Sequence, residues 1–155
     1  MTTDTSTPQK TGAIGWYSAA IARANSLPMS PVQLLSRLAV AHVFWASSQA
    51  KLASWPMTIQ LFTLEYHLPM IDPDVAALLA TAAELGGSIL IFLGLFSRLA
   101  ALLLLVVVAT IQIFVYPENW AEHLTWAALL LLIFSRGAGI FSLDHLATRL
   151  FLKGR

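Results

Sequence analysis

The stretch that decides the fold runs from Asp72 to Arg98 and reads DPDVAALLATAAELGGSILIFLGLFSR. Asp72-Pro73-Asp74 predicts a helix start, with a carboxylate at the N-cap, proline at the first helical position and an acidic first turn that suits the helix dipole. From there to Phe96 the chain is apolar apart from a few small polar residues and one charge, Glu84. That length and composition are typical of a membrane-spanning helix. Ser97-Arg98 is a minimal turn, so the next helix must return antiparallel.

Three further spans are predicted around this one. Ser30-Pro31 repeats the start signal, and Pro56 stops the helix that it opens. Pro117 ends the apolar run that follows Arg98, and the last span is short. The sequence therefore predicts an all-α integral membrane protein, in which a four-helix antiparallel bundle occupies residues 31–136, with spans at 31–54, 73–96, 98–116 and 121–135.

Composition supports a membrane location. Hydrophobic residues make up 57% of the 155 residues and charged residues 11%, against roughly 45–50% and about 25% in soluble domains. The net charge of +1 indicates no nucleic-acid partner. The absence of cysteine excludes disulfides, thiolate metal sites and dithiol redox chemistry carried by this chain.

The segments outside the spans are predicted to be peripheral. Residues 1–30 form a tail that is disordered to about Gly12, and beyond it is either a short interfacial helix or unstructured chain. The connection at 55–71 is expected to be irregular, with a short amphipathic helix around 59–64. Residues 137–155 form a basic amphipathic tail typical of an interfacial helix. No long apolar stretch opens the chain, so no cleaved signal peptide is expected.

Lysine and arginine placement predicts the orientation, because cytoplasmic loops carry an excess of these residues. With the N-terminus inside, seven basic residues fall on the cytoplasmic side, whereas Lys51 alone falls outside. Both termini are therefore expected to be cytoplasmic. The inner basic residues are Lys10, Arg23, Arg98, Arg136, Arg149, Lys153 and Arg155.

Each predicted span places one polar group near mid-membrane, by the rise of about 1.5 Å per residue. These groups are His42, Glu84, Gln112 and His123. Arg37 lies nearer the cytoplasm, with a side chain long enough to climb toward Glu84. A polar outer mouth is predicted from Gln49, Lys51, Glu118 and Glu122.

Three interpretations of this layer stay open. An Arg37–Glu84 ion pair with hydrogen-bonded histidine and glutamine groups would serve helix packing alone. The layer would otherwise bind a small amphipathic molecule such as a quinone head group, with His42 or His123 as donor and Glu84 as proton acceptor. Haem or metal ligation by the two histidines lacks any spacing motif, so no metal site is predicted.

Three stretches carry a family resemblance: residues 34–39 with 49–52, residues 83–87 with 93–101, and residues 137–144. They resemble the DoxX family of small four-helix bacterial membrane proteins, over about 32–146. The resemblance implies that Arg37, Lys51, Glu84 and Arg98 occupy family-type positions. Ser48 departs from the glycine common in the family.

The resemblance implies a bacterial inner-membrane protein and says little about its activity. Together, the polar layer and the resemblance favour an accessory subunit of a membrane redox or stress-response assembly, rather than a stand-alone enzyme, that binds a quinone or lipid-like molecule in that layer. One alternative is a scaffold whose segment 55–71 docks a partner enzyme. Another is a small permease, which would need a homo-oligomer.

Overall fold

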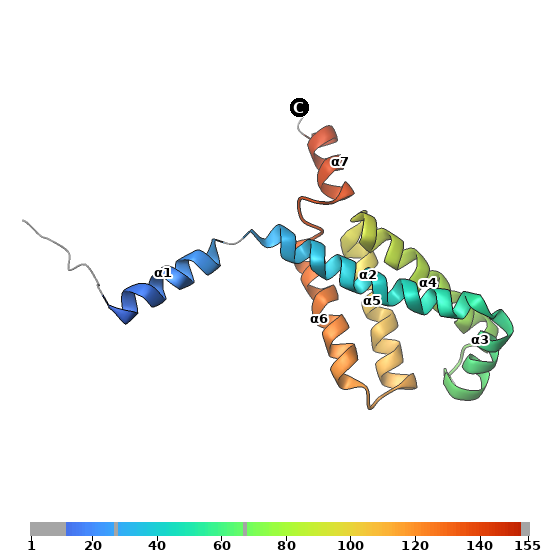
Figure 1. Cartoon of the computed structure of the whole chain (residues 1–155). Helices are drawn as coiled ribbons and strands as arrows, with labels where there is room; N and C mark the ends of the chain where they lie inside the picture. Colours follow the sequence, from blue (N-terminus) through green and yellow to red (C-terminus); the bar gives the residue numbers. More distant parts are fainter. Residues whose placement is uncertain (1–11, 27, 67, 153–155) are drawn as a thin grey trace, which may run out of the picture.

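The computed structural model describes residues 12–26, 28–66 and 68–152, and every regular element in these ranges is a helix (Figure 1). Two of the elements, η1 and η2, are π-helical. The elements are α1 (Ala13–Asn25), α2 (Met29–Ala53), α3 (Trp55–Leu61), η1 (Phe62–Tyr66), α4 (Pro73–Leu93), α5 (Ser97–Thr110), η2 (Ile111–Val115), α6 (Trp120–Arg136) and α7 (Leu143–Leu152).

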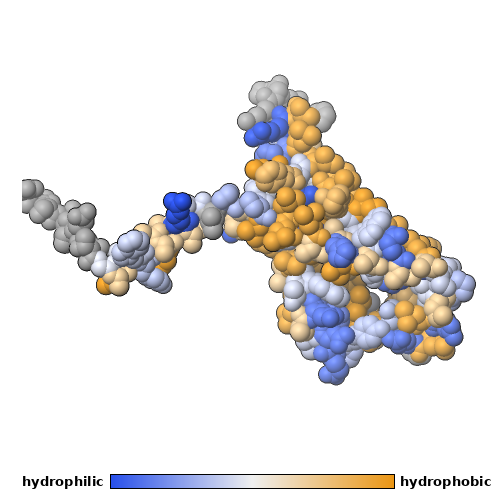
Figure 2. Space-filling model, viewed as in Figure 1, coloured by the Kyte–Doolittle hydropathy of each residue, from blue (hydrophilic) through white to orange (hydrophobic). Residues whose placement is uncertain are grey.

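The four longest helical stretches pack in a closed cycle: α2 contacts α4 and α6, and α5 contacts the same two helices. Their shared core is aliphatic, and Ile91, Leu104, Leu130 and Ile133 are fully buried in it. Large apolar residues also cover much of the outer surface, where hydrophobic colour dominates around α4 (Figure 2). Such a surface would be unfavourable in water but is suited to lipid.

Two helices in the described part of the chain are long and apolar enough to cross a membrane, Pro73–Leu93 and Ser97–Val115. With α5 and η2 taken together, the bounds of the four long helical stretches differ from the predicted spans by at most three residues. Ser30 lies inside α2 and is not its N-cap, because Pro28 precedes a helix that already begins at Met29. The expected break at Pro56 is a sharp bend: Ser54 is extended, and proline then sits in the first turn of α3.

The turn between α4 and α5 is built by backbone geometry and one carboxylate. Gly94 ends α4 in the left-handed region at φ 67, where a side chain would also collide with Arg37 and Ser142. Asp144, from the start of α7, accepts hydrogen bonds from the backbone N–H groups of Phe96 and Ser97. The C-terminal segment therefore caps the N-terminus of α5.

The peripheral segments are more helical than predicted. Of the two alternatives for the chain after Gly12, the helix holds, since α1 spans Ala13–Asn25 and extends away from the packed helices (Figure 1). The connection after α2 forms α3 and η1, so it is not irregular up to Tyr66. The predicted disorder before Gly12 lies outside the described residues.

Candidate ligand-binding site

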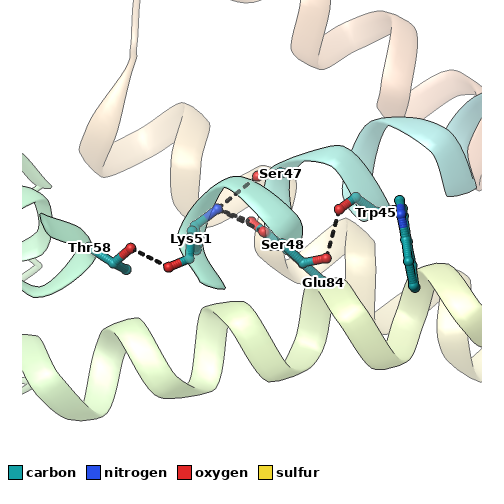
Figure 3. Close-up of polar contacts among 6 residues, drawn as sticks. All are labelled: Trp45, Ser47, Ser48, Lys51, Thr58 and Glu84. Carbon is teal, nitrogen blue, oxygen red and sulfur yellow. Dashed lines mark hydrogen bonds and ion pairs between the residues drawn. The ribbon is translucent and has the colours of Figure 1, made fainter. Parts of the chain in front are cut away.

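A buried ion pair joins the C-terminal end of α2 to the middle of α4 (Figure 3). The ammonium Nζ of Lys51 donates to both carboxylate oxygens of Glu84, at 3.0 and 2.7 Å, and to the hydroxyl of Ser47 at 2.7 Å. Glu84 is 1% exposed and Lys51 9% exposed. Buried charges require such compensation, because desolvation of each ion costs several kcal/mol.

The bend after α2 supports the lysine. The hydroxyl of Thr58, near the start of α3, donates to the backbone carbonyl of Lys51 at 2.7 Å. This bond satisfies one of the carbonyls left free where α2 ends. The position of α3 and the position of the ammonium group are thereby coupled.

The ion pair lines a cavity of about 720 Å³, to which all four packed helices contribute lining residues. Most of its wall is aliphatic or aromatic, including Phe44 and Trp126, whose rings meet edge to face at 6.0 Å. The polar groups are few, and Lys51, Glu84 and His123 are the buried ones among them. A mostly apolar cavity with a few convergent polar groups is the usual form of a small-molecule site.

His123, on α6, is held in one orientation by Gln112 on η2. The ring atom Nδ1 lies 2.6 Å from Oε1 of Gln112, while Nε2 of that amide donates to the carbonyl of Pro117 at 2.7 Å. Because Oε1 of Gln112 is an acceptor, Nδ1 of His123 is the donor in this hydrogen bond. Nε2 is the ring nitrogen left to contact a ligand.

Two tyrosines, one at the end of η1 and one directly after η2, meet beside the cavity. Tyr66 and Tyr116 both line the cavity, and their rings meet edge to face at 5.8 Å. The hydroxyl of Tyr116 donates to the carboxylate of Glu65, which raises the pKa of Tyr116. Burial raises the pKa of Tyr66. Both phenols therefore stay protonated and able to donate at neutral pH.

Arg37 does not pair with Glu84, so that expectation was wrong. Its guanidinium is 1% exposed and donates to the carbonyls of Ile91 and Phe92 at the end of α4, and to those of Ala138 and Phe141 after α6. The last carbonyls of a helix lack intrahelical partners and attract cations. The side chain therefore turns toward the C-terminal end of α4 and not toward Glu84.

Because of how the helices are rotated, some of the other predicted residues line the cavity and some do not. His42 is exposed in a separate groove with Trp45 and Ser88, away from the cavity. Gln49 and Glu118 are exposed and do not line the cavity, whereas Lys51 and Glu122 of the predicted mouth do. Of the predicted layer, Glu84 and His123 converge, and Gln112 acts through His123.

Sequence reasoning missed the pairing of Lys51 with Glu84 and the contact between Tyr66 and Tyr116 beside the cavity. The signal for the first was the position of Lys51, predicted to lie alone on the acidic outer side. The two tyrosines lie in no sequence motif that indicates a site. No cluster of three or more histidine or acidic side chains able to hold a metal occurs among the residues the structure describes.

Comparison with curated proteins and with solved structures returns no match. The DoxX family model matches residues 32–117, which is more than half of the 155 residues. This range contains the ion pair, His42, Gln112 and most of the cavity wall, and it ends before α6 and its His123. On this match, and on its helical membrane-protein character, the chain belongs to the DoxX family.

Proposed function

We propose that this protein binds a small amphipathic molecule, of quinone or lipid-like type, as the membrane subunit of a redox or stress-response assembly. The observation that carries the proposal is the cavity of about 720 Å³, which is apolar along most of its wall and polar at Lys51, Glu84 and His123. A ring with carbonyl or hydroxyl groups suits these side chains. Lys51 supplies a donor, and Glu84 and His123 supply acceptors.

The chain is proposed to cross the bacterial inner membrane four times, with both termini in the cytoplasm. The apolar helices α4 and α5 supply two crossings. Helix α2 is less apolar because it carries Arg37 and Lys51, but both charges are satisfied inside the protein. Intramembrane charges of this kind face the bundle interior and have partners. The concentration of basic residues at the end that carries Arg98 and Arg136 supports this orientation.

Quinone binding is tested by adding decylubiquinone to the full chain in mild detergent and measuring calorimetric heats or tryptophan quenching. We expect saturable one-to-one binding that weakens at least tenfold in Glu84→Gln and His123→Phe, by loss of a polar contact of about 1–3 kcal/mol. Glu118→Gln is the matched control, since this carboxylate is exposed outside the cavity. Binding that is absent in the wild type, or unchanged in both cavity variants, would refute the proposal.

A docking role for the outer segment is favoured by a separate observation. Met57, Leu64 and Met70 are exposed around α3 and the loop that follows, and Met70 is 103% exposed at φ 67. A mild-detergent pull-down with a tag after Arg155 should recover a partner oxidoreductase in stoichiometric amount. Substitution of Leu64 and Met70 by serine should abolish that recovery, and Leu99→Ser should preserve it. Recovery of the protein alone would contradict an accessory role.

A further inference from the structure

The cavity is bounded toward the cytoplasmic end by a close approach of α4 and α5. Gly87 of α4 is buried against Leu104 of α5, and a Cβ added at this glycine would lie 2.8 Å from the leucine side chain. The two helices therefore touch at this level. In Figure 1 they diverge from there, away from the end of the molecule that carries α7.

Beyond this contact, both helices turn an exposed apolar stripe toward the cavity. On α4 the lining includes Leu79, Ala82 and Ala83, and on α5 it includes Leu103 and Val106. Residues spaced by three or four positions share one helix face, so each set forms one edge of a gap. All but Ala83 are exposed, and Val106 is 58% exposed. The cavity is therefore open sideways between α4 and α5.

The composition of this opening contrasts with that of the outer end. Its edges consist of aliphatic side chains, on the two helices that are apolar enough to cross a membrane. At the outer end the exposed lining residues include Asn119 and Glu122, and the rings of Tyr66 and Tyr116 are in contact. An apolar chain entering past these polar groups would desolvate them without compensation.

We infer that the cavity is filled from the lipid phase through the gap between the outer halves of α4 and α5. The occupant is a membrane-dissolved amphiphile: its polar head reaches Lys51 and Glu84, and its apolar chain lies in the gap against Leu103 and Val106. The identity of the occupant rests on the proposed function. The existence of the lateral opening does not, and is tested separately.

The opening is tested without any ligand by spin labelling, for which the cysteine-free chain is suited. Ala83→Cys places the label in the opening. Leu78→Cys on the exposed face of α4 is the lipid-facing reference, and Glu118→Cys is the water-facing reference. In liposomes, oxygen should relax the label at position 83 about as strongly as at position 78, and a water-soluble nickel chelate should have little effect. Relaxation by nickel as strong as at position 118 would overturn the inference.

The entry route is tested by the rate at which decylubiquinone in liposomes quenches tryptophan fluorescence. Ala82→Phe and Val106→Phe should slow association roughly tenfold by overfilling the gap. Leu78→Phe and Leu102→Phe are matched controls on exposed, non-lining positions and should leave the rate unchanged. Tyr116→Ala, which widens the outer end, should also leave it unchanged. Faster entry in Tyr116→Ala with no slowing in Val106→Phe would refute lateral entry.

The two failures are distinguishable. If decylubiquinone does not bind the wild type, the proposed occupant is wrong. Relaxation of the label at position 83 by oxygen and by the nickel chelate still decides whether the opening faces lipid. If decylubiquinone binds but the label at position 83 contacts water, the proposed function stands and the lateral route is wrong.

Discussion

Replacing one member of the Lys51–Glu84 pair should destabilise the protein far more than replacing both. Lys51→Met removes the ammonium group and leaves the Glu84 carboxylate, 1% exposed, without the lysine that neutralises it. Glu84→Leu leaves the lysine with Ser47 as its remaining side-chain partner. The double variant removes both charges and retains comparable apolar volume.

The expected magnitude follows from burial. Breaking a buried ion pair by removal of one partner costs about 3–5 kcal/mol, whereas exchange of the whole pair for apolar side chains is often close to neutral. Because Lys51 is slightly less buried than Glu84, its ammonium can reach solvent more easily when unpaired. Lys51→Met should therefore be the more destabilising single change, at about 4 kcal/mol, and Glu84→Leu should cost about 3 kcal/mol. The double variant should lie within about 1–2 kcal/mol of the wild type.

The assay is equilibrium unfolding of the purified protein from mild detergent into sodium dodecyl sulfate, followed by circular dichroism. The four proteins form a double-mutant cycle, from which the coupling free energy between the two side chains is obtained. Gln49→Met is the control, an exposed position on the same helix that should change stability by less than about 0.5 kcal/mol. Additive single effects, or single effects as small as that of the control, would refute the reasoning.

Three further predictions concern other parts of the fold. Gly87→Ala should destabilise the protein by about 1–3 kcal/mol through overpacking against Leu104. Gly86→Ala, where an added Cβ meets nothing within 4 Å, should be neutral in the same unfolding assay. Arg37→Lys should cost at least about 3 kcal/mol, because a single ammonium cannot serve carbonyls of two segments, and should speed proteolysis of the loop at 137–142. The raised pKa of Tyr116 means that the stability from its hydrogen bond is fully present below about pH 10 and is lost as the pH rises through the folded-state value. The difference in melting temperature between wild type and Tyr116→Phe should therefore be constant to about pH 10 and shrink above it, and a difference that grows above pH 10 would contradict this.

The site illustrates what helix depth can and cannot predict. Counting residues along each helix predicted Glu84 and His123 at comparable depth, and the structure brings both to one cavity. The same count placed His42 in that layer, but rotation of α2 turns it to the surface. Depth depends on the rise per residue, which is constant, whereas rotation depends on packing against neighbours, which a single helix does not specify.

The sequence by itself determined the approximate bounds of the four longest helical stretches and the apolar class of the protein. Asp72, Pro73 and Pro56 act on the backbone within one helical turn, so their effects can be predicted locally. Only the tertiary structure decided which charges meet. Arg37 is drawn to the carbonyls at the end of α4, and Lys51 is left to neutralise Glu84. The partner of a buried charge is whichever compensating group the packed helices bring within reach, and that choice exists only once the helices are assembled.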